Sequence, residues 1–489
     1  MRPRLLLPVL GALLLLGASL MPARPALAAP DSVFRASELL GRPTATSVTV
    51  NVVPAQDVSL YYEYGTTPGT YTSRTSTDAA KAGVASELVL SGLKPSTQYY
   101  YRMQFQSPGG SEWTARPEHS FRTQRAPGEP FVFTLTADSH LDGLPPMGKQ
   151  RYTQATQNIA KDRPDFHLDL GDAVGTDGLS AQSEVDERYL AQRDYFDNFA
   201  DSVPLFLVLG NHENEEGWNF DDTPSLALMG LKARKQLYPT PVPDAFYTGN
   251  TDLLPAIGGD QLREDYYAFE WGDALFVTID PFQYTMTNPY GAVAGEGADD
   301  PASGDQWNWT LGRQQYDWLK ATLQNSHARY KFVFAHHVTG GQIRRQGAPA
   351  AYVRGGANAA AYFEWGGLNA DGSYGFDTQR PGWGVPIHQL MKDNGVTAFF
   401  HGHDHQYAYE LYDGIVYQEL PSPSMMGPGF NLYSESDPFT KKVLPNAGHL
   451  RITVDPARIT VDYVTAGIGP NAASNGQVAY SYTIDAPAR

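Results

Sequence analysis

Histidine, aspartate and asparagine gather in five short motifs along this chain of 489 residues. Seven of its twelve histidines lie in these motifs, a concentration that scattered core or surface histidines would not give. Imidazole, carboxylate and amide oxygen bind borderline or hard metals such as Zn, Mn, Fe or Co. The motifs therefore predict a metal centre. In chain order they are Asp138-Ser139-His140, Gly171-Asp172, Gly210-Asn211-His212-Glu213, His336-His337 and His401-Gly402-His403-Asp404-His405.

Each motif comes directly after a short apolar run that is typical of a buried strand, and amphipathic stretches separate several of the runs. Strands that end in ligand-type residues bring those residues to one edge of a sheet. We therefore expect an α/β domain whose sheet edge holds the metal centre. The expected strands are residues 131–136, 166–170, 205–209, 274–279, 332–334 and 397–400, and the expected helices include 152–161, 314–325 and 385–394.

Taken singly, each motif has an ordinary structural explanation. Asp138 and Asp172 could cap helices, and Gly210-Asn211 could form a turn. His336 could be a hydrogen-bonded core histidine. The order of all five motifs favours metal binding, because chance would have to place each ligand type after its own apolar strand.

This ordered set resembles the signature of the calcineurin-like metallophosphoesterase superfamily, and the likeness spans nearly all of the chain after residue 130. The resemblance implies an α/β four-layer domain over residues 130–470, in which a β-sandwich is flanked by helices. It also implies two divalent or mixed-valence metal ions, bridged by the carboxylate of Asp172. The other ligands implied are Asp138, His140 and His405 for the first metal and Asn211, His336 and His403 for the second.

The purple acid phosphatase branch of that superfamily is the nearest in pattern, because an N-terminal sandwich and the run from His403 to Tyr407 resemble it. That branch has a tyrosine ligand three residues after the bridging aspartate, where this chain has Gly175. It also usually lacks a histidine at the position of His140. Because an imidazole would replace a phenolate, we expect an enzyme without the purple charge-transfer colour.

The resemblance implies hydrolysis of phosphate mono- or diesters by in-line attack of a hydroxide that bridges the two metals. Two cations about 3.5–4 Å apart lower the pKa of such a water and clamp the attacking and leaving oxygens. His212, next to Asn211, is expected to act as general acid or charge stabiliser. Glu213 is expected either to orient the His212 ring or to be a solvated member of the acidic run 213–216.

A phosphoester also needs contacts beyond the metals, and the expected ones are Asn211, His337 and Arg354. Arg354 follows Arg344 and Arg345 in a long irregular segment, where a guanidinium could bind a phosphate oxygen bidentately. The alternative is that these arginines are solvated surface residues.

The class of ester stays open. Irregular segments at 282–309 and 340–378 are rich in aromatic residues and are expected rims of a cleft. The alternatives to mono- or diester hydrolysis are a phosphotriesterase or phospholipid-directed hydrolase on the same centre, or a non-catalytic surface-binding protein. All seven ligand positions are filled, which favours the enzyme. The aromatics that could accept an aryl or apolar leaving group, or equally belong to the core, include Trp307, Trp309, Tyr362, Trp365 and Trp383.

The N-terminal quarter has a different pattern. Short runs rich in Val, Tyr and Thr, separated by turn residues, predict an antiparallel β-sandwich over residues 40–125. Within it, residues 93–102 resemble the tyrosine corner of fibronectin type III domains, with Tyr99 as the corner residue. A linker containing proline and glycine follows at 125–130. Residues 471–489 are expected to be a C-terminal tail.

Residues 1–28 have the features of a secretory signal peptide: a basic start, an apolar middle and small residues before the expected cleavage site. The chain has no cysteine, so bacterial-type export to a secreted or periplasmic location fits best. We expect no stable membrane span after cleavage. Cleavage removes three arginines and no acid, which takes the formal charge from −17 to −20. That charge argues against nucleic acid and for a small-molecule phosphoester as substrate.

Overall fold

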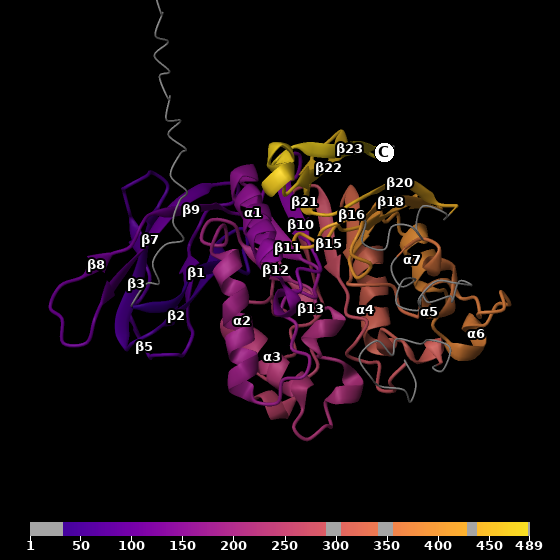
Figure 1. The fold of residues 1–489 in the computed structure, drawn as a ribbon, viewed down its shortest axis with the longest axis horizontal. Coiled ribbons are helices and arrows are strands. Elements are labelled where there is room, and N and C mark those ends of the chain that lie inside the picture. The colour runs from indigo at the N-terminus through magenta and orange to yellow at the C-terminus, as the bar shows by residue number, and fades with distance from the viewer. Residues whose placement is uncertain (1–32, 290–304, 341–355, 428–437, 488–489) are drawn as a thin grey trace, which may run out of the picture.

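The N-terminal part of the chain is a β-sandwich in the computed structural model, which describes residues 33–289, 305–340, 356–427 and 438–487 (Figure 1). One sheet has the order β1-β2-β6 and the other β4-β3-β7-β8, with β5 paired to β3 and β9 to β7. Burial alternates along β3 and β6, because every second side chain of a strand faces the core. The bounds are β1 Phe34–Gly41, β2 Ser47–Pro54, β3 Val58–Gly65, β4 Ser73–Arg74, β5 Asp78–Ala80, β6 Ser86–Ser91, β7 Gln98–Gln106, β8 Thr114–Ala115 and β9 His119–Arg122.

The sandwich begins earlier than the expected residue 40, because Phe34 of β1 already buries its side chain in the sandwich core. Tyr99 is buried, and its Oη accepts a hydrogen bond of 3.0 Å from the Lys94 N–H. This bond ties β7 to the turn before it, as expected of a tyrosine corner. Assignment to the fibronectin type III class stays a prediction.

Two larger sheets form the rest of the chain, and their parallel strands end at a common edge. The first has the order β12-β11-β10-β21-β22-β23 and the second β13-β14-β15-β16-β17-β19-β18-β20. Strands β10, β11 and β12 run parallel, as do β15, β16, β17 and β19. The bounds are β10 Phe131–Thr136, β11 Phe166–Asp169, β12 Leu205–Leu207, β13 Thr248–Gly249, β14 Tyr267–Trp271, β15 Ala274–Thr278, β16 Tyr330–Phe334, β17 Ala398–His401, β18 Tyr407–Tyr412, β19 Ile415–Glu419, β20 Thr440–Leu444, β21 Gly448–Val454, β22 Arg458–Thr465 and β23 Val478–Asp485.

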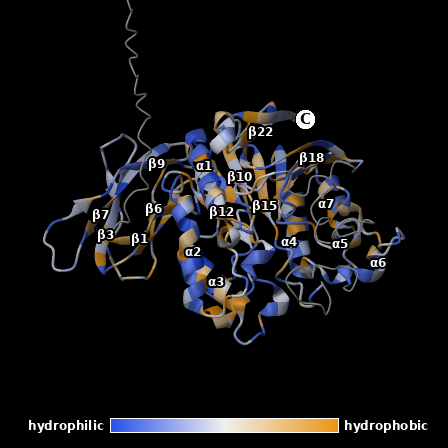
Figure 2. Ribbon diagram, viewed as in Figure 1, coloured by the Kyte–Doolittle hydropathy of each residue, from blue (hydrophilic) through white to orange (hydrophobic). Residues whose placement is uncertain are grey.

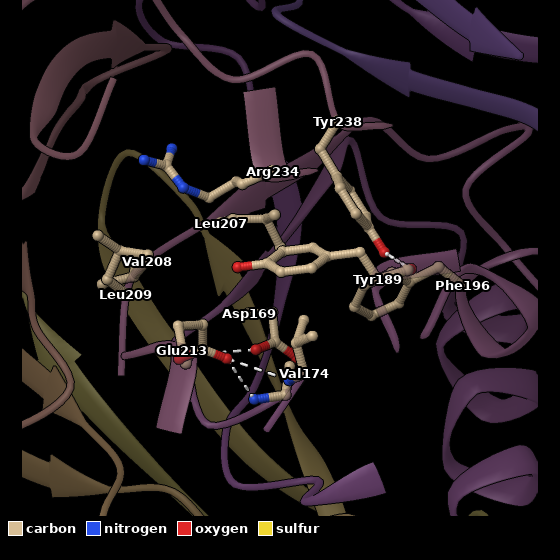
Figure 3. Close-up of a pocket in the computed structure, with 12 residues that line it drawn as sticks. Asp169, Val174, Tyr189, Phe196, Leu207, Val208, Leu209, Glu213, Arg234 and Tyr238 are labelled. Carbon is tan, nitrogen blue, oxygen red and sulfur yellow. Dashed lines mark hydrogen bonds between the residues drawn. The ribbon is translucent and has the colours of Figure 1, made fainter. Parts of the chain in front are cut away.

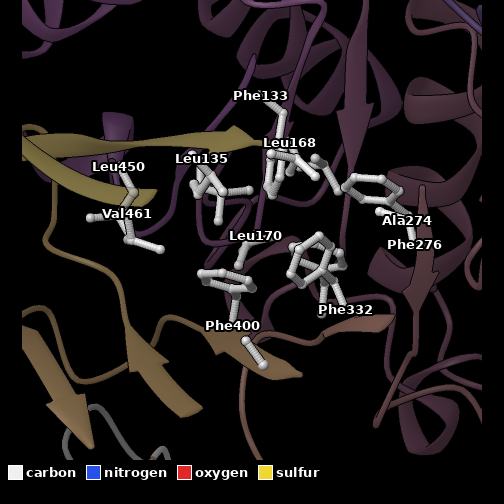
Figure 4. Packing of buried hydrophobic residues seen from close by; sticks show 14 of the residues in the cluster. Phe133, Leu135, Leu168, Leu170, Ala274, Phe276, Phe332, Phe400, Leu450 and Val461 are labelled. Atoms are coloured by element: carbon white, nitrogen blue, oxygen red, sulfur yellow. The ribbon is translucent and has the colours of Figure 1, made fainter. Parts of the chain in front are cut away.

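A core rich in phenylalanine fills the space between these two sheets (Figure 4). Phe133 of β10 is fully buried, with its ring centroid 5.7 Å from that of Phe166 and 5.1 Å from that of Phe276. Phe332 and Phe400 also reach Phe133 from the opposite sheet. Such rings bury large apolar areas and interlock by edge and face contacts, so the core holds the two sheets in a fixed relation.

Helices cover the outer faces of both sheets, which gives the four layers expected (Figure 1). The hydropathy colouring shows the alternation of hydrophobic and hydrophilic residues along these helices that is typical of amphipathic elements (Figure 2). The three predicted helices fall in α1, α4 and α7, and the fold class is confirmed. The helices are α1 Pro146–Asp162, α2 Gln182–Phe196 and α3 Leu226–Leu237 beside the six-stranded sheet, and α4 Gly312–Asn325, α5 Phe363–Gly366, α6 Phe376–Gln379 and α7 Ile387–Asp393 beside the eight-stranded one.

The prediction of a C-terminal tail over residues 471–489 is wrong for the segment that forms β23. This strand pairs antiparallel with β22 at the edge of the six-stranded sheet. Tyr482 buries its ring there and stacks on Tyr409 with centroids 4.0 Å apart. The sequence carried a signal for this, because apolar residues alternate at Val478, Tyr480, Tyr482 and Ile484.

A buried arginine joins the sandwich to the rest of the chain. Arg193 of α2 is 0% exposed, and its guanidinium donates to the backbone carbonyls of Asn51 (3.1 Å) and Leu237 (2.8 Å). It also donates to the carbonyl of Ser37 and the side chain of Asn51. A buried charge is costly without such partners, so the acceptors that the sandwich supplies are needed to keep Arg193 buried at this contact. In the described part of the chain, no helix is both long and apolar enough to span a membrane.

Candidate metal centre

The five motifs meet at the edge where strands of both sheets end. Backbone hydrogen bonds join neighbouring strand ends: the Asp138 N–H donates to the Gly171 carbonyl (2.9 Å), and the Gly402 N–H donates to the His336 carbonyl (3.0 Å). The sequence therefore predicted correctly which residues the fold brings together. The residues at the ends of β10, β11, β12, β16 and β17 are, in that order, Asp138, Asp172, Asn211, His336 and His401.

Two clusters of potential metal ligands share one carboxylate. The ligand atoms within each cluster all lie within 4.8 Å of one another. In the second cluster, His336 Nε2 is 3.0 Å from Asp172 Oδ2 and 3.3 Å from His403 Nδ1. Asn211 Oδ1 lies 3.0 Å from the same nitrogen of His403 and so adjoins this cluster. The first cluster is Asp138, His140, Asp172 and His405, and the second is Asp172, His336 and His403.

The donor set fits the metals that the sequence predicts. His140 Nε2 and His405 Nε2 face each other at 2.8 Å, and His405 Nε2 is 3.5 Å from Asp138 Oδ1. Nitrogen and oxygen atoms that converge on one point in this way suit a cation between them, and imidazole with carboxylate is a donor set that Zn, Mn, Fe and Co accept. The residues could hold one ion in each cluster.

Several of these residues have a left-handed backbone. The φ angles are 61° at Asp138, 45° at His140, 55° at Asp172, 80° at His403 and 52° at His405. A side chain with a Cβ disfavours this conformation by about 1–2 kcal/mol per residue, so it persists only where the surrounding structure enforces it. The sharp turns direct the side chains of consecutive motif residues toward the centre.

Glycines allow the loops to approach this closely. A Cβ added at Gly210 would lie 2.3 Å from Asp172 Oδ1, and one added at Gly402 would lie 2.6 Å from Asp138 Oδ2. Neither position has room for a side chain. The glycines of the Gly-Asn-His-Glu and His-Gly-His motifs are therefore required by the packing around the carboxylates.

The clustered charges shift the pKa values of the site in opposite directions. Burial by itself raises the pKa of Asp172, but the positive charges of His336 and His212 outweigh it and hold that pKa well below its usual range. Burial lowers the pKa of His336, yet Asp172 and Asp138 raise it to about 9. Burial, together with the neighbouring His140, holds the pKa of His405 well below its usual range. A neutral His405 and an ionised Asp172 are in the protonation states that metal ligands need.

His212 points its two ring nitrogens at two different carboxylates. Nδ1 contacts Asp177 Oδ2, and Nε2 is 3.9 Å from Asp172 Oδ2. Burial lowers the pKa of His212, but the charges of Asp172 and Asp177 outweigh it and raise that pKa to about 10. Asp177 also accepts a hydrogen bond of 3.2 Å from the Asn214 side chain. His212 is partly exposed, and its imidazole lies between Asp177 and the shared carboxylate.

Asp177 was missed by sequence reasoning, which assigned the orienting role to Glu213. Glu213 instead accepts hydrogen bonds from the backbone N–H groups of Asp172 and Ala173, both at 2.9 Å. The interpretation of the acidic run 213–216 as solvated is wrong, because Glu213, Glu215 and Glu216 are 3–5% exposed. Residues 175–178, Gly-Thr-Asp-Gly, look like an ordinary exposed turn, so only the folded loop reveals the contact of Asp177 with His212.

Of the predicted substrate contacts, the structure describes His337 but not Arg354. His337 is buried, and its ring packs against Trp309 (4.9 Å between centroids), Phe282 (5.1 Å) and His403 (5.2 Å). A contact between His337 and a substrate stays a prediction. Arg354, with Arg344 and Arg345, lies outside the described residues. Of the aromatics considered for a leaving group, Trp307, Trp309, Trp365 and Trp383 are all buried, as core residues are.

His401 and Asp404 of the last motif are linked through the carboxylate of Glu419. His401 Nδ1 is 2.6 Å from Glu419 Oε2, and the other oxygen of Glu419 accepts the Asp404 N–H at 3.0 Å. The two serines after β19 play a similar part: Ser422 Oγ donates to the Asp138 carbonyl and Ser424 Oγ to the Ser139 carbonyl, both at 2.8 Å. Such contacts fix the orientation of the residues they touch.

Residues 131–407 match the calcineurin-like phosphoesterase family. The chain belongs to this family. It is therefore a metal-dependent phosphoester hydrolase, as the motifs predicted. A comparison with curated protein sequences finds no match.

Two solved structures show the same fold over most of the chain. The structure of PhoD is 16% identical, with a TM-score of 0.65, over 95% of this chain and 92% of that one. The purple acid phosphatase PPD1 from yellow lupin (Lupinus luteus) seeds is 17% identical, with a TM-score of 0.58, over 92% of this chain and 74% of that one. The predicted order, a β-sandwich followed by a phosphoesterase domain, is confirmed at the level of fold.

Proposed function

We propose that this phosphoesterase is an exported enzyme with two metal ions, which hydrolyses phosphate mono- or diesters. The observation that carries the proposal is that Asp172 belongs to both ligand clusters. Asp172 Oδ2 faces both clusters, at 3.6 Å from His140 Nε2 and 3.0 Å from His336 Nε2, so this carboxylate would be shared by two neighbouring cations. Asp138, His140 and His405 would complete the first site, and Asn211, His336 and His403 the second.

Two bound cations supply charge to neutralise a phosphoryl group and lower the pKa of water that attacks it. The protein's own residues would then hold the ligand atoms in position and donate a proton to the leaving oxygen. Asp172 is oriented by the His212 backbone N–H, which donates to Asp172 Oδ1 at 2.9 Å. The His336 ring is oriented from behind, because its Nδ1 lies 2.8 Å from the Leu170 carbonyl. Both contacts hold ligand atoms in place before a substrate arrives.

His212 would donate a proton to the leaving oxygen or stabilise charge on the phosphoryl group. The contact with Asp177 keeps the imidazole protonated and fixes its ring, which is the arrangement that a general acid needs. Asn211, which adjoins the second cluster, would contact the phosphoryl group as well. Asn211, His337 and Arg354 remain the proposed substrate contacts.

Export rests on the sequence of residues 1–28 and on the absence of cysteine from the chain. The acidic character of the chain bears instead on the substrate. A formal charge of −17 over the full sequence repels polyanions, so a small phosphoester is a better substrate than a nucleic acid. Attraction for a phosphate must then come from the local positive charge of the metal centre.

The test combines metal analysis with hydrolysis assays on the purified mature protein. We expect about two metal ions per chain and chelator-sensitive hydrolysis of aryl phosphate mono- or diesters. Faster hydrolysis of a triester or of a phospholipid would reassign the substrate class on the same centre. Protein that binds no metal and hydrolyses none of these esters after reconstitution would contradict the proposal.

A further inference from the structure

Glu213 joins two loops of the metal centre through four backbone hydrogen bonds. One carboxylate oxygen accepts the N–H groups of Asp172 (2.9 Å) and Gly210 (2.7 Å), and the other accepts those of Ala173 (2.9 Å) and Val174 (3.1 Å). Residues 172–174 follow β11, whereas Gly210 follows β12. One side chain therefore holds together the ends of two neighbouring strands.

The charge of Glu213 is balanced by these N–H dipoles. The side chain is 4% exposed and lines a small cavity together with Asp169 and Tyr189 (Figure 3). Arg234 lines the same cavity but pairs with Glu215, through two hydrogen bonds of 2.8 Å.

The four hydrogen bonds also occupy every acceptor site of the Glu213 carboxylate. An ionised carboxylate has about four lone-pair sites, and here a backbone N–H group occupies each one. Proton transfer would need one of these sites free to face the reacting atoms. The close packing of the loops adds to this, since a Cβ at residue 210 would lie 2.9 Å from Glu213 Oε2.

We propose that Glu213 is a positioning residue, which holds the left-handed backbone of Asp172 and so places the shared carboxylate between the two clusters. The proposal rests on the proposed function, because Asp172 matters as the residue common to both clusters. The Asp172 N–H that Glu213 accepts belongs to the residue with φ 55°. Without that bond, the unfavourable backbone conformation loses a contact that enforces it.

The test compares Glu213→Gln with the unchanged protein in two measurements. The amide group of glutamine turns one accepting oxygen into a donor, which then faces two N–H groups and loses both hydrogen bonds. In metal-free protein we expect faster hydrogen–deuterium exchange at the amides of residues 172–174 and 210. In titration calorimetry with Zn²⁺ or Mn²⁺ we expect metal affinity to fall by about 10–100-fold.

Glu364→Gln is the matched control. Glu364 is also a fully buried carboxylate that accepts a backbone N–H, from Leu311 at 2.7 Å. It pairs with Arg380 and belongs to neither ligand cluster. This variant should leave the exchange at residues 172–174 and the metal affinity unchanged. An equal effect in both variants would show only the general cost of neutralising a buried carboxylate, and would overturn the proposal.

Unchanged amide exchange and metal affinity in Glu213→Gln would also overturn it. So would normal metal affinity combined with loss of one limb of the pH–rate profile, which is the signature of a proton-transfer residue. If Glu213→Gln does not fold, Glu213→Asp gives the same comparison, because it keeps both oxygens on a shorter side chain. Wild-type protein that binds no metal would contradict the proposed function, while the amide exchange would still test the link from Glu213 to the Asp172 loop.

Discussion

The same strands form two contrasting regions. Between the two large sheets they form an apolar core, and at their ends they carry a polar rim. In the core, Phe133 and Phe400 are fully buried on extended strands and touch other aromatic rings. A few residues further on, Asp138 and His403 have left-handed backbones, and the Asp138 carboxylate accepts the His403 backbone N–H at 2.9 Å. The apolar core stabilises the fold, whereas the polar rim costs free energy and depends on the fold to hold it in place.

The difference shows how a strained site persists. Left-handed residues and converging carboxylates each cost free energy, and they are tolerated because a rigid core fixes the strand ends from which they project. We therefore expect changes at the rim to remove activity with little loss of stability. Changes in the core should do the reverse.

The largest effect is expected from Asp172→Asn. Loss of the charge shared by the two clusters should lower kcat/KM by on the order of 10³-fold or more, since such charge contributes several kcal/mol to phosphoryl transfer. The free energy of unfolding of the metal-free protein should fall only modestly, because the attraction between Asp172 and His336 is lost but His336 can then release its proton. Phosphoester hydrolysis and urea unfolding measure the two quantities. Near-normal activity in Asp172→Asn would contradict the expectation that changes at the rim remove activity.

Phe133→Ala tests the other side of the comparison. Removing a fully buried ring from the centre of the core should cost about 3–5 kcal/mol in the free energy of unfolding, measured in urea. The specific activity of the protein that remains folded should stay close to that of the wild type. A proportionally larger loss of activity than of stability would mean that the core shapes the site directly. Val478→Ala, at an exposed position of β23, is the control and should change little.

Asp177→Asn should lower kcat by about 10-fold, because His212 loses the partner that orients its ring and keeps it protonated. The loss should come with a shift of the alkaline limb of the pH–rate profile to lower pH, since less negative charge faces the imidazole. Asp57→Asn, which changes a similarly exposed carboxylate on the sandwich, should have no effect on either. An unchanged pH–rate profile in Asp177→Asn would show that Asp177 has no influence on His212 during catalysis.

The smallest effect concerns the contact between the sandwich and the catalytic part. His119 Nδ1 of β9 lies 3.0 Å from Asp201 Oδ2. Burial lowers the pKa of His119, but Asp201 outweighs it and raises that pKa above its usual value. The stabilisation is thus fully present below about pH 6.5 and is lost as pH rises through the folded-state pKa.

Between about pH 6 and pH 9, the wild type should therefore lose about 0.5–1 kcal/mol of stability relative to His119→Gln, as measured by thermal unfolding. Identical pH dependence in the two proteins would show that this pair contributes nothing. Asp201→Asn should match His119→Gln if the pair acts as one unit.

The candidate site could be predicted from the sequence far better than the parts that support it. Asp138, Asp172 and His336 each follow an apolar run, so the local pattern carries both the strand and the ligand. Asp177 and the four contacts of Glu213 depend on how two loops meet, which no local pattern records. The early start of β1 and the strand β23 were missed for a different reason. Each pairs with the neighbouring strand along the chain, and the alternating apolar residues of β23 were a local signal that the sequence analysis did not use.

The central claim is that Asp172 lies between two metal sites, and anomalous diffraction from crystals grown with Zn²⁺ or Mn²⁺ tests it most directly. The account predicts two anomalous peaks per chain, one beside each ligand cluster, with the Asp172 carboxylate between them. A single peak, or two peaks of which neither contacts Asp172, would contradict it.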